Sequence, residues 1–209
     1  DSDSKVQSQL DRNLQFESWL FEFSITGEFN FFKYAPGDMN HFITPFLFGG
    51  VSIFNFNPRT QAGDGNMYEL QPLGTEGQGT VAYPDRKKYA LTTAAIPFGL
   101  GLKLNISKTF SVGLEWGMRY TFTDYLDDVS GTYGDPAKVK AANGGDGDAA
   151  AYFSNPSIPI QDGDKVIDKS GPSFINLQRG NPGSKDTYMF LTLALNYKFV
   201  SKKTNRPKF

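Results

Sequence analysis

Apolar residues alternate with polar or small ones from Phe110 to Thr123, and this is the clearest pattern in the chain. A period of two places the apolar set on one face of a β-strand and the polar set on the other. The polar set includes Glu115 and Arg119, which is too much charge for the core of a soluble β-sandwich. At about 3.4 Å per residue, this strand is long enough to cross a bilayer at a tilt.

Four other segments, at 19–31, 42–56, 92–105 and 189–199, show the same alternation with unequal clarity. In three of them we expect the apolar set to face outward and the polar or small set to face inward. Between Phe42 and Phe56 both faces are apolar, so the outward face of that strand stays open. The expected outward residues are Trp19, Phe21, Phe23, Ile25, Phe29 and Phe31, then Thr92, Ala94, Ile96, Phe98, Leu100, Leu102 and Leu104, and finally Met189, Leu191, Leu193, Leu195, Tyr197 and Phe199.

The connections between these segments are of two kinds. Lys33–His41 and Asn105–Thr109 are short, whereas 57–89 and 124–186 are long, polar and rich in Gly, Asp, Asn and Pro. Outer-membrane barrels have short periplasmic turns and long extracellular loops. The pattern therefore predicts two long extracellular loops and a periplasmic C-terminus.

These segments predict an all-β fold, a small transmembrane antiparallel β-barrel. About five strands are visible, whereas the smallest standard barrel has eight, so we expect about three further strands before Asp1. Residues 1–199 then form one barrel domain, and residues 200–209 form a basic periplasmic tail. The alternative is that residues 1–13 are a flexible tail on an open sheet, which would leave backbone groups unpaired in lipid.

Composition agrees with a barrel and excludes several other classes of protein. Aromatic residues make up 15% of the chain, as in the aromatic girdles of outer-membrane barrels. The 21 basic and 22 acidic residues nearly balance, which argues against a nucleic-acid partner. The absence of cysteine excludes disulfides and zinc–thiolate sites. The chain has no run of about 18 apolar residues, which excludes a transmembrane helix.

Several stretches are similar to the PorG family of Bacteroidota outer-membrane proteins. They are EFNFF at 28–32, YELQPLGTEGQG at 68–79, IPFGLGLK at 96–103, TFTDYLDDVSGTY at 121–133 and RGN at 179–181. The resemblance implies a small eight-stranded barrel of the type IX secretion system. It also implies association, on the periplasmic side, with the ring formed by the lipoprotein PorK and its partner PorN. Family members begin with further strands, which agrees with the strand count.

Inward-facing charged residues are the first candidates for a functional site. They are Glu22, Glu28, Lys103, Glu115 and Arg119. The lumen of an eight-stranded barrel is just large enough for its own side chains, so we expect a salt-bridged polar plug with Arg119 paired inside it. A path for protons or ions is the alternative, since charged groups inside membrane proteins can be functional.

Three acidic residues, Asp124, Asp127 and Asp128, stand where a strand enters a predicted extracellular loop. Carboxylate oxygens are ligands for Ca²⁺, which makes a metal site one interpretation. Asp also caps backbone amides in turns, and we favour this structural role. We therefore expect no metal and no other cofactor.

Catalysis is not expected either. The sole histidine, His41, lies in a predicted periplasmic turn with no nucleophile beside it. The strings GLG and GDG lack the strand–loop–helix setting of a phosphate-binding loop.

The predicted function is a non-enzymatic scaffold that anchors the PorK/PorN ring to the outer membrane. Its basic C-terminal tail would meet an acidic partner or lipid headgroups, and other secretion-system subunits are further possible partners. Two alternatives stay open, a small outer-membrane channel and a binding protein that uses its extracellular loops outside secretion. The candidate periplasmic contacts are His41, Lys108, Lys202, Lys203 and Arg206.

Overall fold

The computed structural model describes residues 13–63, 65–157, 160–162, 165–167 and 172–199. The chain divides into two compact units, each assembled from three stretches of sequence. The loop unit comprises Asp1–Phe23, Ile53–Ala94 and Thr121–Asp186. The strand unit comprises Ser24–Ser52, Ala95–Tyr120 and Thr187–Phe209.

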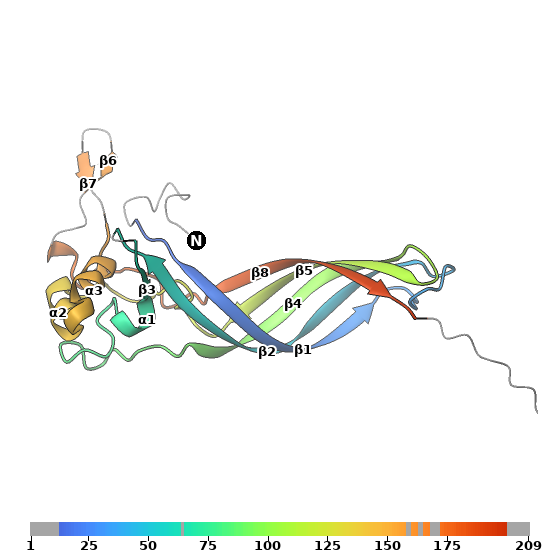
Figure 1. Cartoon of the computed structure of the whole chain (residues 1–209), viewed down its shortest axis with the longest axis horizontal. Helices are drawn as coiled ribbons and strands as arrows, with labels where there is room; N and C mark the ends of the chain where they lie inside the picture. Colours follow the sequence, from blue (N-terminus) through green and yellow to red (C-terminus); the bar gives the residue numbers. More distant parts are fainter. Residues whose placement is uncertain (1–12, 64, 158–159, 163–164, 168–171, 200–209) are drawn as a thin grey trace, which may run out of the picture. The chain divides into compact units, whose positions relative to one another are not determined.

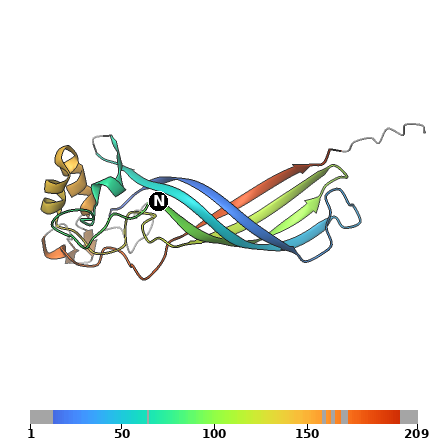
Figure 2. The same ribbon diagram turned by 90° about the horizontal axis from the view of Figure 1, so that it is seen from below.

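Five long strands form one antiparallel sheet that curls into half a barrel (Figure 1, Figure 2). Their order in the sheet is β1-β2-β4-β5-β8, so β1 and β8 are its edges. Strands β5 and β8 run antiparallel, with Phe110 opposite Tyr197 and Tyr120 opposite Thr187. The predicted antiparallel, mainly β architecture is confirmed at this level. The strands are β1 (Glu17–Asn30), β2 (Ile43–Gln61), β4 (Thr92–Asn105), β5 (Phe110–Thr121) and β8 (Thr187–Tyr197).

Strand β4 has the two faces that its alternation predicts. Ala95 is 1% exposed, whereas the adjacent Ile96 is 42% exposed, and the pattern continues along the strand. Small residues are required on the inner face: a Cβ added at Gly101 would lie 2.6 Å from the carbonyl oxygen of Leu114 and would overlap the ring of Phe46. The absence of a side chain at Gly101 therefore leaves room for the ring of Phe46, on the neighbouring strand β2.

The structure assigns the faces of β2, which the sequence left open. Phe46 and Phe54 are buried on the inner face, whereas Leu47 and Val51 are exposed on the outer face. The strand also continues to Gln61, so the expectation that a loop begins at position 57 is wrong. The reason is that alternate burial continues beyond that point, and the short strand β3 (Met67–Glu69) pairs with the end of β2.

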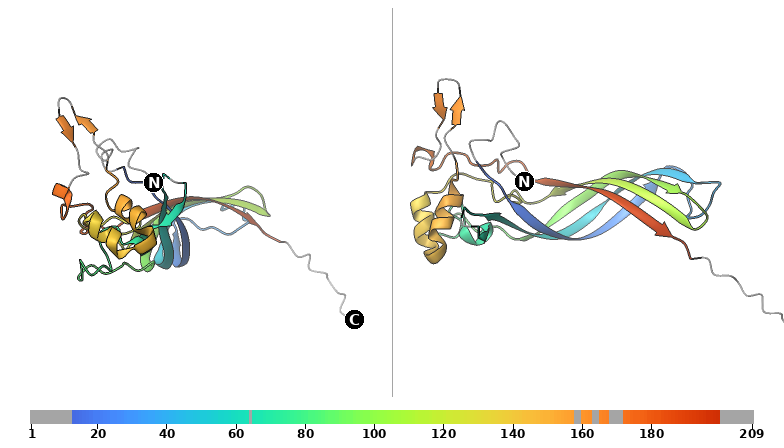
Figure 3. Two further views of the ribbon diagram at one scale, coloured as in Figure 1. Left: turned by 60° about the vertical axis from the view of Figure 1, so that its left-hand side comes forward. Right: turned by 45° about the horizontal axis from the view of Figure 1, so that its top comes forward.

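The predicted long loops contain short helices, which the sequence analysis missed. Asp135 begins α2, because its Oδ1 accepts a hydrogen bond from the Ala137 amide at 3.0 Å and Pro136 occupies the first turn. Helices α2 and α3 pack side by side (Figure 3). The additional elements are α1 (Leu70–Leu73), α2 (Pro136–Ala142), η3 (Gly144–Asp146), α3 (Gly147–Ser154), β6 (Ile160–Asp162), β7 (Lys165–Ile167) and η4 (Pro172–Phe174).

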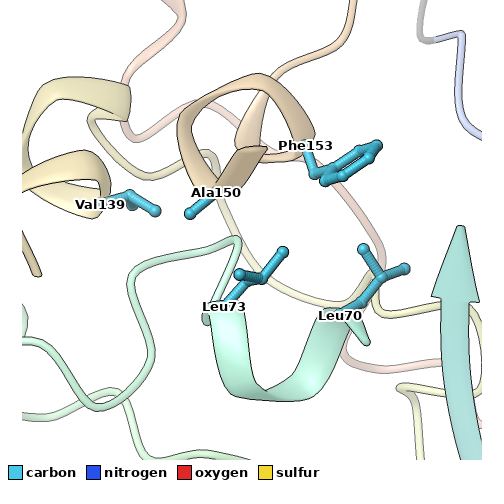
Figure 4. Packing of buried hydrophobic residues seen from close by; sticks show 5 residues of the cluster. All are labelled: Leu70, Leu73, Val139, Ala150 and Phe153. Carbon is cyan, nitrogen blue, oxygen red and sulfur yellow. The ribbon is translucent and has the colours of Figure 1, made fainter. Parts of the chain in front are cut away.

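These helices enclose a small apolar core in the loop unit. Its buried members are Leu70, Leu73, Val139, Ala150 and Phe153, drawn from α1, α2 and α3 (Figure 4). A core of this size buries little apolar surface, so polar interactions must contribute to the structure of the loop unit. Within the described part of the chain, no helix combines the length and the apolar character needed to cross a membrane.

Candidate functional site

Three sequence stretches that lie far apart along the chain meet in the loop unit, around the side chain of Arg179. They are 75–78, 124–131 and 179–181. The guanidinium of Arg179 and the carboxylates of Glu76 and Asp128 are each no more than 2% exposed. Charged groups are rarely buried so completely unless they are paired, which makes this cluster the most specific polar arrangement in the loop unit.

Arg179 is the centre of the cluster. Its Nη1 lies 3.3 Å from Oε1 of Glu76 and 4.0 Å from Oδ2 of Asp128. The same nitrogen donates to Oγ1 of Thr75 at 3.0 Å and to the carbonyl oxygen of Asp128 at 2.9 Å. Nη2 donates to the carbonyl oxygen of Phe153, at the end of α3, at 3.1 Å. One guanidinium thus connects the turn that follows α1, the segment 124–131 and the end of α3.

The carboxylate of Glu76 binds main-chain amides of a distant turn. Its Oε1 accepts from the Ser130 amide at 3.0 Å, and its Oε2 accepts from the Gly131 amide at 2.9 Å. The Glu76 amide in turn donates to Oε1 of Gln78 at 2.9 Å. Charge-assisted hydrogen bonds of this kind are stronger than neutral ones, so Glu76 fixes the path of the chain at 130–131.

Aromatic rings adjoin the acidic side of the cluster. The rings of Tyr89 and Tyr125 stack with centroids 4.5 Å apart, and Tyr89 also stacks on Phe56 at 6.2 Å. The Tyr89 hydroxyl donates to Oδ1 of Asp128 at 2.7 Å. Burial, followed by the nearby Asp128 carboxylate, raises the pKa of Tyr89 above its ordinary value. The phenol therefore stays protonated and remains a donor.

A second arginine, Arg86, holds the loop between α1 and β4. Its Nη2 donates to Oγ1 of Thr132 at 2.8 Å, and its Nη1 donates to the main-chain oxygens of Glu76 and Thr132. The guanidinium carbon lies 4.3 Å from the ring centroid of Tyr83, whose hydroxyl accepts from the Asp135 amide at 2.9 Å. Arg179 and Arg86 therefore both stabilise the loop between α1 and β4, Arg179 by binding Thr75 and Glu76 and Arg86 by connecting the loop to Thr132.

The three acidic residues considered for Ca²⁺ have separate partners. Asp124 Oδ2 accepts from the Ser130 hydroxyl at 2.6 Å, and Asp127 Oδ1 accepts from the Val129 amide at 3.0 Å. Asp128 binds Thr75 and Tyr89. No group of three or more His, Cys, Asp or Glu side chains suited to a metal occurs in the part of the chain that the structure describes.

Burial changes the protonation of these acids. Burial raises the pKa of Asp127 to about 7, and repulsion from Asp186 adds to the increase. Burial also raises the pKa of Asp128 to about 6, although the Arg179 guanidinium opposes it. The pKa of Asp124 and that of Asp186 are raised as well, with burial as the main cause in both.

The predicted inward charges lie on the strands, and the structure brings two of them together. The Lys103 ammonium forms a salt bridge with the Glu28 carboxylate and lies 4.7 Å from the ring centroid of Phe46. The Arg119 guanidinium carbon lies 4.9 Å from the ring centroid of Phe190. That Arg119 is paired with a carboxylate stays a prediction. Glu22 on β1 and Glu115 on β5 are half-buried.

Two of the predicted periplasmic contact residues, His41 and Lys108, lie in the turns at one end of the strand unit (Figure 2). His41 Nδ1 lies 2.9 Å from Oδ2 of Asp38, and this contact lowers the pKa of Asp38. The Lys108 main chain lies against Gly37 and leaves no room for a Cβ there, and the positive φ of Gly37 also favours glycine. The three remaining members of the predicted contact set, Lys202, Lys203 and Arg206, lie outside the described residues.

Asn105 joins these turns, and the sequence analysis missed this role. Its Oδ1 accepts from the Tyr34 hydroxyl at 2.9 Å and from the Gly37 amide at 3.2 Å. Its Nδ2 donates to the carbonyl oxygens of Ala35 and Asp38 at 3.0 and 3.1 Å. The available signal was its place as the last inward residue of β4, a position where an amide side chain can reach the neighbouring turn.

A family model described as a domain of unknown function, DUF6089, matches residues 1–71 and 76–151 of the chain. Searches of curated proteins and of solved structures give no match. The match includes Glu76 and Asp128 and ends before Arg179.

Proposed function

The chain belongs to the DUF6089 family, and we propose that it is a non-enzymatic outer-membrane β-barrel protein of the type IX secretion system. In this proposal the protein crosses the outer membrane several times and anchors the periplasmic PorK/PorN ring. The proposal combines the architecture of the sheet with the resemblance of five sequence stretches to the PorG family.

The observation that carries the membrane assignment is the apolar outer face of the strand unit. Ile25 on β1, Val51 on β2 and Leu191 on β8 are 66%, 64% and 72% exposed. Contiguous apolar surface on this scale is unfavourable in water and is typical of a membrane or protein interface. Lipid is the favoured environment, because the opposite face has a salt bridge and small residues, as in the lumen of a narrow barrel.

Closure of the barrel is part of the proposal. The described sheet has two open edges, β1 and β8, and open edges in lipid would leave backbone amides and carbonyls unpaired. About three additional strands between these edges would give a standard barrel of about eight.

The turn end of the strand unit is the proposed contact surface for the ring. Short turns face the periplasm in bacterial outer-membrane barrels. Asn105 holds the Lys33–His41 turn in a defined conformation, which reduces the entropy lost on binding. Ile106, Met39 and Lys108 are all exposed in these turns, so the turns offer both apolar and basic groups.

Site-specific photo-crosslinking tests the proposal in membranes that contain the whole secretion system. A crosslinking residue at His41 or Lys108 is expected to capture PorK or PorN. The same residue at Asp85, an exposed position in the loop unit, serves as the matched control and is expected to capture neither. Absence of any ring component from the adducts at both turn positions would overturn the anchoring function.

A further inference from the structure

The buried cluster around Arg179 contains more negative than positive groups. Glu76 and Asp128 share the one guanidinium of Arg179, which can neutralise only one of them. Arg86 and Lys185 are the other cations near the cluster, so among the described residues five carboxyl groups face three cations. The charged and titratable groups that face the cluster are Glu76, Asp124, Asp127, Asp128 and Asp186, the cations Arg86, Arg179 and Lys185, and the phenols Tyr89 and Tyr125.

Asp127 and Asp186 are two like charges of this cluster, and repulsion from Asp186 raises the pKa of Asp127. Asp127 Oδ1 accepts from the Val129 amide at 3.0 Å, and Asp186 Oδ2 accepts from the Leu126 amide at 2.8 Å. Two carboxylates thus bind amides of the same short segment from different parts of the chain. A carboxyl group beside a like charge ionises less readily than one alone.

We propose that closure of the loop unit is coupled to proton uptake by these carboxyl groups, so that the unit is held most firmly under mildly acidic conditions and loosens as the pH rises. The coupling arises because the closed loop unit packs the surplus carboxyl groups away from water, whereas the open unit hydrates them separately. The three segments that meet at Arg179 are the parts that separate on opening.

The direction of the effect follows from the protonation of the two central acids. In an unfolded chain an Asp titrates near pH 3.9. In the folded protein burial raises the pKa of Asp127 to about 7 and that of Asp128 to about 6. Between these values the closed state binds more protons than the open state. The contribution of these two acids to the stability of the closed state is therefore fully present below about pH 4 and is lost as the pH rises through about 6 to 7.

Hydrogen exchange of the full chain in detergent micelles measures the coupling directly. The Ser130 and Gly131 amides, which donate to Glu76, report on closure of the loop unit. Their protection factors, taken relative to the intrinsic exchange rate at each pH, are compared between about pH 5 and pH 8. We expect protection to fall by up to about tenfold per pH unit for each proton released. Amides of residues 43–52 of β2, which belong to the strand unit and are far from these groups in sequence, serve as the internal reference.

Two isosteric variants and one control separate this effect from a general loss of stability. Asp127→Asn removes one titrating group. The fall of the protection factors with pH is therefore expected to become less steep, by up to about tenfold per pH unit. Asp186→Asn removes the like charge beside Asp127 and is expected to move the transition to lower pH. Asp85→Asn, at an exposed position, is expected to behave as the wild type.

Two results would overturn the proposal. One is wild-type protection at 130–131 that does not fall with rising pH. The other is an Asp127→Asn or Asp186→Asn profile that matches the wild type in both slope and midpoint. If Asp127→Asn fails to fold, the shift expected for Asp186→Asn decides the question alone.

Discussion

The guanidinium of Arg179 donates a hydrogen bond to the main-chain oxygen of Asp128 at 2.9 Å, although the two residues are 51 positions apart in sequence. The same guanidinium reaches Glu76, which is 103 positions away. The loop unit has a small apolar core, so long-range contacts of this kind determine how its segments are joined. A buried charge that loses its partner is costly, so the loop unit should be sensitive to replacement of Arg179.

Replacement of Arg179 by Met should destabilise the loop unit by about 3–5 kcal/mol, because it leaves two buried carboxylates without their cation. Urea unfolding followed by near-UV circular dichroism, to which the stacked Tyr89 and Tyr125 contribute, measures the loss. Lys140→Met is the matched control, since Lys140 forms an exposed salt bridge with Asp148 and should cost at most about 1 kcal/mol. Equal midpoints for the two variants would contradict the central role of Arg179.

Asn105→Ala should release the Lys33–His41 turn. The substitution removes an amide that bonds Tyr34, Gly37, Ala35 and Asp38, and it should cost on the order of 2–3 kcal/mol. Faster hydrogen exchange confined to this turn is the expected result. Asn40→Ala, a change at an exposed position in the same turn, should leave exchange almost unchanged. Similar exchange in both variants would show that Asn105 does not hold the turn.

Gly101→Ala should weaken the sheet, because its Cβ would meet Leu114 and the ring of Phe46. Overpacking of this kind costs about 1–3 kcal/mol. Gly27→Ala is the control, since nothing lies within 4 Å of a Cβ at that position on β1. Folded and heat-unfolded protein are separated by gel electrophoresis after heating to increasing temperatures. The unfolding temperature should fall for Gly101→Ala and not for Gly27→Ala. A normal transition temperature for Gly101→Ala would contradict the packing of Phe46 across β4.

The Lys103–Glu28 salt bridge should contribute modestly to stability. Both side chains are partly exposed, at 25% and 34%, so a coupling of up to about 1 kcal/mol is expected. A double-mutant cycle with Lys103→Met and Glu28→Gln measures it. The exposed Lys140–Asp148 pair provides a reference cycle with smaller coupling. No measurable coupling between Lys103 and Glu28 would remove the support for a salt-bridged inner face.

The sequence was sufficient to predict the strands whose two faces differ chemically. On β4, Ile96 and Leu100 alternate with small residues, so the period alone assigns the outer face. On β2 it does not, because Phe46 and Leu47 are both apolar and only packing against Gly101 selects the inner one. Periodicity describes one strand at a time and contains no information about its neighbours.

The contacts within the loop unit could not be predicted from the sequence, for a related reason. Asp124, Asp127 and Asp128 are recognisable as turn formers, but their partners come from other segments. Nothing near Arg179 in sequence indicates that it binds Glu76. The short helices α2 and α3 had local signals, such as the Asp135–Pro136 start, which the long polar context obscured.

Lipid contact of the outer face is the central claim, and Trp116 allows its most direct test. This side chain is 39% exposed on the outer face of β5. With Trp19 replaced by Phe, Trp116 is the one remaining tryptophan in the sequence. The full chain, reconstituted in vesicles with brominated acyl chains, should show strong quenching of its fluorescence and little quenching by aqueous iodide. Quenching by iodide with no effect of the brominated lipid would contradict the membrane barrel.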